Sequence, residues 1–168
     1  MGSKIRIAEF KNRLAALCLR GGGRGFPCKH RDQHVLFKSV TLMLETKRHY
    51  AENELNECLA KWLSQVGRSV EIDHVSLRRY MVDAGYLTRD TAGRSYRVDP
   101  EPTVGLFEAG IEDIDPLAVV EAAYRDAEER KREYLEKARK RLMRLVPQFP
   151  KHAGDEGDSL CVGVDAIT

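Results

Sequence analysis

The sequence predicts a mainly α fold with a small β-hairpin, and three observations indicate it. Apolar residues recur at spacings of three and four along most of the chain, which is the period of an amphipathic helix. Two short β-prone runs flank the turn-forming residues 90–93. The chain has 168 residues, which is enough to bury a hydrophobic core without disulfides or a metal.

Residues 1–25 predict an N-terminal helix followed by a glycine-rich linker. Ser3 can cap this helix, and a helical spacing places five apolar residues on its buried face: Ile7, Phe10, Leu14, Leu17 and Cys18. Residues 21–25 read Gly-Gly-Gly-Arg-Gly and end the helix. They lack the Gly-Lys-Ser/Thr ending of a phosphate-binding loop and follow no predicted strand, so we do not expect nucleotide binding there.

Residues 26–99 predict a small domain that contains three helices. The first of them begins near Asp32 as its N-cap and keeps Lys38 on its solvent side. The next helix runs from about residue 51 to residue 65, and Gly67 stops it. The last helix begins after the N-cap Asp73 and ends before Gly85. Its apolar positions at i, i+3, i+4 and i+7 are Leu77, Tyr80, Met81 and Ala84.

A hairpin is predicted directly after these helices. Residues 86–89 and 95–98 are its strands, and residues 90–93 form its turn. Three helices followed by a hairpin is the order of a winged helix-turn-helix domain. The fold class is therefore a winged helix-turn-helix-like domain, flanked by an N-terminal helix and a long C-terminal helix.

The C-terminal third predicts a linker at residues 100–114, a long amphipathic helix at residues 115–147 and a disordered tail at residues 148–168. The helix carries an apolar seam, interrupted at Lys131, that consists of Leu117, Val120, Tyr124, Ala127, Leu135, Ala138, Leu142 and Leu145. Such a seam packs on the domain or pairs with the same helix of a second copy, and we favour a homodimer. The basic residues 137–144 either touch phosphates or stabilise the helix C-terminus, and we favour the latter.

Several segments of the chain are similar to the bacterial family called domain of unknown function 2087, which often occurs in candidate transcriptional regulators. They are Pro27-Cys28-Lys29, residues 50–57 (Tyr-Ala-Glu-Asn-Glu-Leu-Asn-Glu), residues 73–89, and Gly93, Ser95 and Tyr96. The run Leu77-Arg78-Arg79-Tyr80-Met81-Val82-Asp83-Ala84-Gly85-Tyr86-Leu87 is the most specific. The resemblance covers roughly residues 5–98. It implies a winged-helix-like fold and a regulatory context, and it names no ligand and no reaction.

Arg78 and Arg79 are the strongest candidates for binding DNA. Both are expected on the exposed side of the predicted helix that follows Asp73, which is the helix that would enter a major groove as a recognition helix. Arginine can bind both acceptors of a guanine edge or a phosphate. The alternative is that nearby carboxylates pair with these arginines within the chain. Glu71, Asp73 and Asp83 are placed to do so, and acidic residues on that face also repel phosphate.

Three further arginines lie in the predicted hairpin. Arg94 at its tip, with Arg89 and Arg97 in its strands, can contact the phosphate backbone as a wing does, or can be ordinary solvated charges. The basic stretch of Arg20, Arg24, Lys29 and Arg31 is either a flexible arm for nucleic acid or a charged linker.

No catalytic, metal or cofactor site is expected. Cys28, His30 and His34 have a spacing that could bring three metal ligands together, but no fourth ligand is near them in the sequence. Neither a nucleophile with a base nor a cofactor fingerprint emerges. We therefore predict that the protein is not an enzyme.

Charge and cysteine usage limit the setting of the protein. The net charge is +2, but residues 1–50 contain 11 Lys or Arg against 3 Asp or Glu. The four cysteines, Cys18, Cys28, Cys58 and Cys161, form no Cys-x-x-Cys pair, which indicates free thiols in a reducing compartment. No signal peptide or membrane span is predicted. We expect a cytoplasmic protein without a membrane partner.

The sequence thus predicts a dimeric, DNA-binding transcriptional regulator whose contacts are Arg78, Arg79, Arg94, Arg97 and Arg89. A non-catalytic protein-interaction module on a winged-helix scaffold is the alternative, favoured by the near-neutral net charge. A metal-binding regulator or enzyme that uses Cys28 and the nearby histidines is a third, weaker interpretation.

Overall fold

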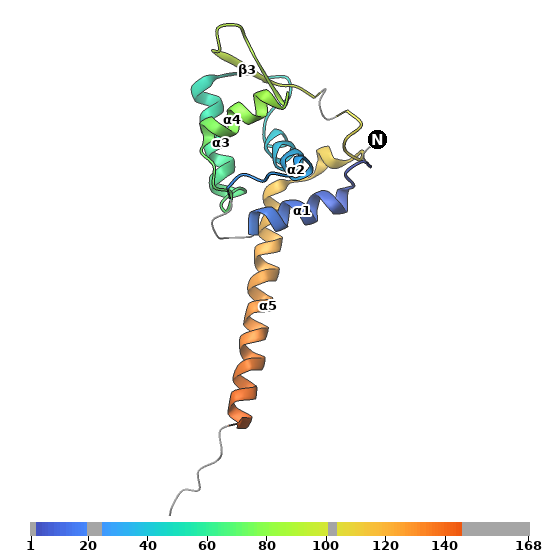
Figure 1. The fold of residues 1–168 in the computed structure, drawn as a ribbon, viewed down its shortest axis with the longest axis vertical. Coiled ribbons are helices and arrows are strands. Elements are labelled where there is room, and N and C mark those ends of the chain that lie inside the picture. Colours follow the sequence, from blue (N-terminus) through green and yellow to red (C-terminus); the bar gives the residue numbers. More distant parts are fainter. Residues whose placement is uncertain (1–2, 20–24, 101–103, 146–168) are drawn as a thin grey trace, which may run out of the picture. The chain divides into compact units, whose positions relative to one another are not determined.

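The computed structural model of the protein describes residues 3–19, 25–100 and 104–145 (Figure 1). The chain divides into two units, of which the first ends at Arg130 and the second begins at Lys131. In the first unit α1 (Ile7–Leu19), α2 (His30–Thr41), β1 (His49–Ala51), α3 (Glu52–Gln65) and α4 (His74–Asp83) precede β2 (Leu87–Arg89) and β3 (Ser95–Val98). A short 3-10 helix, η2 (Ile111–Asp113), then leads to α5 (Pro116–Leu145), which continues into the second unit.

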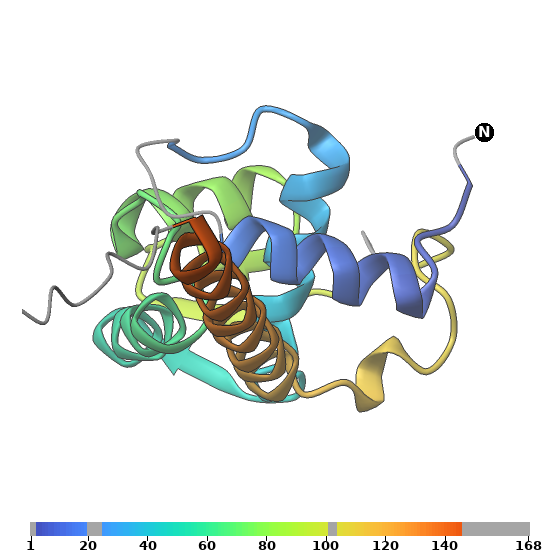
Figure 2. The same ribbon diagram turned by 90° about the horizontal axis from the view of Figure 1, so that it is seen from below.

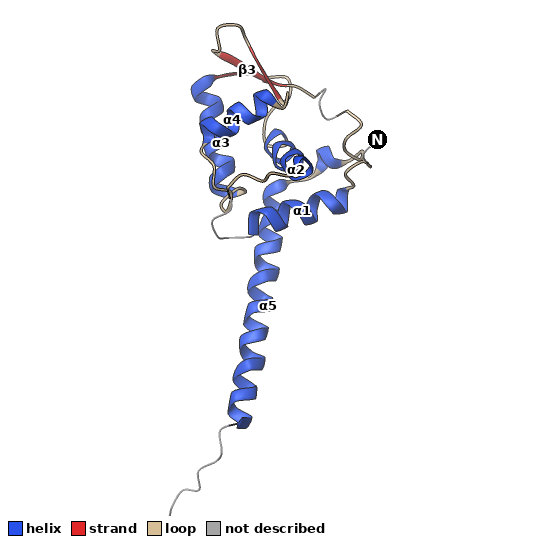
Figure 3. Cartoon of the chain, in the orientation of Figure 1, coloured by secondary structure: helices blue, strands red, loops and turns tan. Residues whose placement is uncertain are grey.

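The fold is mainly helical with a three-stranded antiparallel sheet whose strand order is β1-β3-β2 (Figure 3). The predicted hairpin is confirmed as β2 and β3, and β1 joins it as an additional strand on the other side of β3. The sequence analysis missed β1 because three residues are too short to show the alternation of a strand. Three helices, with a strand before the second and a hairpin after the third, make the arrangement winged-helix-like.

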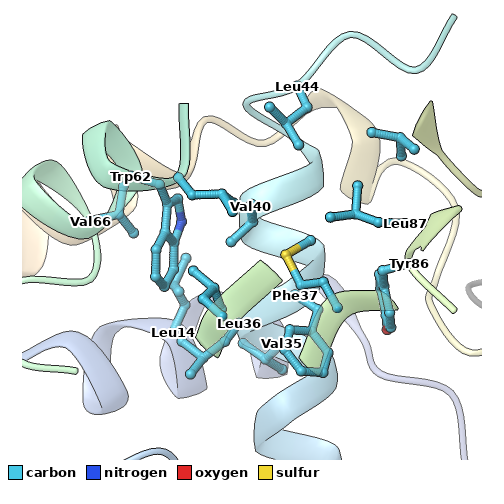
Figure 4. Packing of buried hydrophobic residues seen from close by; sticks show 14 of the residues in the cluster. Leu14, Val35, Leu36, Phe37, Val40, Leu44, Trp62, Val66, Tyr86 and Leu87 are labelled. Carbon is cyan, nitrogen blue, oxygen red and sulfur yellow. The ribbon is translucent and has the colours of Figure 1, made fainter. Parts of the chain in front are cut away.

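Helix α2 lies at the centre of the core. All seven residues from Val35 to Thr41 are buried, so this part of the helix is enclosed on every side. Figure 4 shows Trp62 of α3 and Val66, which directly follows α3, on one side of α2, and Tyr86 and Leu87 on the other. The core therefore joins α3 to the start of the hairpin through α2.

Helix α1 packs on α2 through Phe10, Leu14 and Cys18, all fully buried. The prediction that Ser3 caps this helix is wrong. The helix begins at Ile7, whose backbone N–H donates to the Glu108 carboxylate at 2.8 Å. A carboxylate far along the chain thus satisfies the helix terminus, a pairing that no local sequence pattern reveals.

An ion-pair network also ties α1 to α2. Arg31 of α2 donates to Glu9 of α1 at 2.7 Å, and Arg13 bridges Glu9 at 2.8 Å and Asp32 at 2.6 Å. Asp32 was expected to cap α2, but the N-cap is Lys29 and Asp32 lies inside the first turn. Its carboxylate accepts from Arg13 instead, so the interhelical pair, and not the cap, accounts for this acidic residue.

The segment from residue 104 to residue 114 was expected to be a linker, yet it contributes to the core. Phe107 and Ile111 are buried. Ile5 lies opposite Phe107 in an isolated bridge, in which its N–H donates to the Leu106 carbonyl and its carbonyl accepts from the Glu108 N–H. Lys38 was expected to face solvent, but it is buried and donates to Glu112 at 2.9 Å. Since a buried ammonium needs a charged partner, η2 supplies the carboxylate that this position requires.

The start of α5 packs on the first unit, as the apolar seam predicts. Val120 is buried, and the Tyr124 hydroxyl donates to the backbone carbonyl of Cys18 at 2.9 Å. In the second unit, α5 ends at Leu145, and residues 148–168, predicted to be a disordered tail, lie outside the described residues. No helix among the described residues is long and apolar enough to cross a membrane.

The end of α3 is fixed by a close approach between Gly67 and Trp62. The Gly67 N–H donates to the Trp62 carbonyl at 3.0 Å, which confirms that the glycine stops the helix. A Cβ atom at position 67 would lie 2.5 Å from the Trp62 ring. The indole N–H donates in turn to Ser39 of α2 at 3.2 Å, so the ring cannot move without breaking a buried hydrogen bond.

We therefore expect Gly67→Ala to destabilise the fold by about 1–3 kcal/mol, the usual cost of overpacking a core. The measurement is the free energy of unfolding in urea. Gly25→Ala is the control, because a Cβ atom there meets nothing within 4 Å, and it should change stability by less than about 0.5 kcal/mol. Equal effects of the two substitutions would contradict the role of the Trp62 contact.

A second prediction concerns acid unfolding. The hydrogen bond from Arg31, aided by that from Arg13, lowers the pKa of Glu9 from 4.5 to about 2. A carboxyl whose pKa is lower in the folded state contributes stability above pH 4.5, and this contribution is lost as the pH falls toward 2. Glu9→Gln should therefore lower the urea midpoint at pH 6 and have little effect near pH 2.

The control for this prediction is Glu57→Gln, since Glu57 is exposed and has no ion pair among the described residues. A Glu9→Gln effect that is the same at both pH values would show that the network contributes nothing through the charge of Glu9.

Candidate nucleic-acid interface

Helix α4 is positioned by a strong cap at its start. The Asp73 carboxylate accepts from the backbone N–H groups of Val75 and Ser76, both at 2.9 Å, and from the Ser76 hydroxyl at 2.6 Å. These hydrogen bonds, led by that from the Ser76 side chain, lower the pKa of Asp73 to about 2. The predicted cap is confirmed, and so is Gly85 as the residue after the helix, with a φ angle of 79°.

Arg78 does not lie on the exposed face of α4, as the sequence analysis expected. Only 8% of it is exposed, because its guanidinium group is directed at α3 and the sheet. It pairs with Glu52 at 2.8 Å, donates to the Asn56 side chain, and lies over the Tyr96 ring at 5.3 Å. The intramolecular alternative thus holds for Arg78, although with Glu52 and not with Glu71, Asp73 or Asp83.

Arg79, in contrast, is exposed and has no ion pair or side-chain hydrogen bond within the described residues. The neighbouring Asp73 carboxylate is already occupied by the helix cap. Neither Glu71 nor Asp83 lies within ion-pair distance of Arg79, although both are exposed. The two adjacent arginines therefore have different environments, and only Arg79 is available to a partner.

An aromatic stack that the sequence analysis missed borders this face of α4. Tyr80 is 46% exposed, and its ring stacks on Phe26 with centroids 5.1 Å apart. Phe26 also stacks on Phe37 of α2 at 5.5 Å. The Gln33 side chain donates to the carbonyl of Pro27 at 2.8 Å, which holds the segment before α2 in place. Tyr80 was expected on the buried face of α4. Instead its ring stacks on Phe26, which the segment before α2 holds next to α4.

The hairpin presents Arg89, Arg94 and Arg97, all three of them exposed. Asp90 shapes the turn, since its carboxylate accepts from the backbone N–H groups of Arg94 at 2.7 Å and Ser95 at 3.1 Å. These bonds, led by that from Ser95, lower the pKa of Asp90. Arg97 lies opposite His49 on β1 in the sheet register. The hairpin therefore has three exposed cations, with Arg94 at its hydrogen-bonded turn and Arg89 and Arg97 in its strands.

The basic stretch before α2 does not form an arm in the described part of the chain. Arg20 and Arg24 lie outside the described residues. Arg31 pairs with Glu9 and donates to the carbonyls of Ser3 and Lys4, so it holds the N-terminus against α2.

The residues considered for a metal lie around one pocket without forming a site. Cys28, His30 and His34 line it, together with Tyr80 and Asp83. His34 shares a hydrogen bond of 2.7 Å with the Tyr86 hydroxyl, and burial, followed by the charge of His30, lowers the pKa of His34. Within residues 3–19, 25–100 and 104–145, no group of three or more His, Cys, Asp or Glu side chains could hold a metal ion.

The cysteines of the described residues are all free thiols. Cys18 is buried, which raises its pKa to about 12, Cys58 is half-buried and Cys28 is exposed. Cys161 lies outside the described residues.

Residues 24–98 match the model of a family described as an uncharacterized protein conserved in bacteria, domain of unknown function 2087, and this segment of the chain belongs to that family. The match spans α2, the sheet, α3 and α4, and it includes Glu52, Asn56 and Arg78. No curated protein matches the chain. No solved structure matches it either.

The environment of Arg78 yields a prediction about stability. Arg78→Ala should lower the free energy of unfolding by about 2 kcal/mol, because it removes a largely buried, multiply bonded side chain. Arg78→Lys should recover only part of that loss, since a lysine ammonium cannot reproduce the planar fork over Tyr96. Urea unfolding measures both variants.

Arg79→Ala is the matched control for this prediction. It changes the neighbouring arginine on the same helix and should alter stability by less than about 0.5 kcal/mol. The structural role of Arg78 is refuted if the two alanine variants are equally stable.

Proposed function

We propose that the protein is a DNA-binding transcriptional regulator that acts as a dimer in the cytoplasm. The observation that carries this proposal is the contrast between the two adjacent arginines of α4. Arg78 is buried and forms an ion pair within the chain, whereas Arg79 is exposed and has no ion pair among the described residues. A winged-helix-like arrangement places such a helix against DNA.

The hairpin supports the same proposal. Arg89, Arg94 and Arg97 add three cations in the element that serves as the wing. Their residue type suits phosphate oxygens, which accept hydrogen bonds from guanidinium groups. In this proposal Arg79 contacts base edges or phosphates in the groove, the hairpin arginines contact the backbone, and Arg78 positions α4 without touching DNA.

A second candidate function, a non-catalytic protein-interaction module, is favoured by the far part of α5. Four large apolar side chains there are exposed by more than half: Tyr134, Leu135, Leu142 and Met143. Such a row on a helix is typical of an interaction surface. We propose no catalytic residue, metal or cofactor for either candidate.

Substitution of Arg79 tests the proposal directly. Arg79→Ala should weaken binding to pooled genomic DNA fragments about tenfold or more at a fixed salt concentration, because a specific arginine contact contributes about 1–3 kcal/mol. Arg94→Ala should weaken binding less and reduce the slope of log affinity against log salt by about 1, as expected for one phosphate contact. A fluorescence titration at several salt concentrations gives both quantities.

Arg6→Ala is the matched control, since Arg6 is exposed and has no ion pair among the described residues. It should leave affinity nearly unchanged. If the folded wild type binds no fragment even at low salt, DNA binding is wrong and the interaction module takes its place. If Arg79→Ala binds as the wild type does, α4 is not the contacting helix.

A further inference from the structure

An apolar groove in the first unit is lined by residues of α1, of the start of α5 and of the segment before α5. Figure 2 shows α1 next to the first turns of α5. Its walls are formed by small and medium apolar side chains from both helices and from the end of η2: Ala15, Ile114, Ala118, Val119, Ala122 and Ala123. Small side chains let a partner helix approach closely, and large apolar side chains of that partner would fill the space. Ala118 is exposed, and Ala15, Ala122 and Ala123 are half-buried, so part of each remains accessible.

The charges around the groove are mainly acidic. Asp113, Asp115 and Asp126 line it, and Lys11 is the basic residue among the lining side chains. The Asp115 carboxylate accepts from the backbone N–H of Leu117, and the three aspartates have no ion pair among the described residues. The groove therefore suits an apolar helix that carries unpaired cations.

The second unit contains a helical segment with these properties. In residues 131–144 the apolar row of Leu135, Ala138 and Leu142 follows spacings of three and four, and Tyr134 and Met143 lie beside it. The side chains of Leu135 and Leu142 are 56% and 64% exposed. This row has no apolar neighbour among the described residues.

The charges of that segment are strongly unbalanced. It holds seven basic residues and two acidic ones, Glu133 and Glu136. Both glutamates pair with lysines one turn further on, Lys137 and Lys140, which leaves five cations without an acidic partner in the described residues. They are Lys131, Arg132, Arg139, Arg141 and Arg144. Arg132 and Arg139 are three or four residues from Leu135, so they border the apolar row.

We propose that residues 131–144 of α5 dock into the groove between α1 and α5 of a second copy of this chain, and that the second copy does the same in return. This inference deepens the proposed dimer and rests on it, but it does not depend on DNA binding. Residues 116–145 form one unbroken helix, and an unbroken helix cannot turn back alongside its own first turns. We therefore assign the occupant of the groove to a second copy of the chain.

Charge also favours this contact over direct pairing of the two apolar rows. Pairing them with each other would bring five unpaired cations of one copy against five of the other, which is repulsive. Docking in the groove instead places Arg141 and Arg144 near Asp113 and Asp115, and Lys131 near Asp126, if the helices are antiparallel. The wall that α5 contributes to the groove, from Ala118 to Asp126, extends about 12 Å at 1.5 Å per residue. The segment of residues 131–144 extends about 20 Å on the same basis, so it is long enough to cover the groove.

The test is the oligomeric state of the full chain, measured by sedimentation equilibrium in the absence of DNA. The wild type should be a dimer. Ala122→Arg, which places a cation in the groove, and Leu142→Glu, which places a charge in the apolar row, should each weaken dimerisation at least tenfold. Glu121→Arg is the matched control, because Glu121 is exposed on the same helix and does not line the groove, and it should dimerise as the wild type does.

Mixing the two variants gives a sharper result. An Ala122→Arg copy keeps an intact helical segment, and a Leu142→Glu copy keeps an intact groove, so the mixture should associate more tightly than either variant alone. Circular dichroism checks that both are folded, and Ala118→Arg, at an exposed position in the groove, replaces Ala122→Arg if that variant unfolds.

Two outcomes would overturn the proposal. If the groove variants dimerise as tightly as the wild type while Leu142→Glu is monomeric, the apolar rows pair with each other. A monomeric wild type would leave the segment to an anionic partner of another kind. Because no DNA is present, a dimer that fails to bind DNA would contradict the proposed function and leave this contact intact.

Discussion

The enclosure of α2 is the constraint on which the first unit depends. A helix buried on every side needs apolar neighbours all round and a partner for each polar group that it carries inside. Ser39 of α2 meets the indole of Trp62, and Lys38 meets Glu112. The second pair explains why residues 104–114 are packed, since the carboxylate must be held where the buried ammonium lies. Helix α1 closes the remaining side through apolar contacts and the network around Glu9 and Arg31.

Arg78 fixes the position of α4, the helix of the candidate interface, relative to α3 and the sheet. Its guanidinium group joins α4 to α3 through Glu52 and Asn56 and to the sheet through Tyr96, so three elements are held by one side chain. Contacts with a partner are more specific when the residues that make them lie on rigid elements. Arg79 follows on the same helix and faces outward because Arg78 faces inward. The motif of two arginines thus combines a structural residue with a candidate contact.

The helices and the hairpin were predictable because their signals are local: the cap at Asp73, the glycine after α4, and apolar residues at helical spacings. The inward direction of Arg78 was not, because it depends on Glu52 and Asn56 across an interhelical contact. The same holds for the capping of α1 by Glu108 and the burial of Lys38, whose partners lie 101 and 74 residues away. Of the candidate site, the sequence predicted the exposure of Arg79, Arg89, Arg94 and Arg97, and missed the stack of Phe26 on Tyr80.

The distribution of charge links the proposed function to self-association. One copy offers four exposed arginines near α4 and the hairpin, while Glu71 and Asp83 lower the positive potential of the helix itself. Four phosphate contacts give modest affinity at physiological salt, since each adds only a small salt-dependent contribution. Two linked copies bind as one unit, and the second binding event then occurs at a high effective concentration. The net charge is only +2, so under the proposed function a dimer would raise the affinity for DNA. The proposed contact at the groove between α1 and α5 would then matter for DNA binding as Arg79 does.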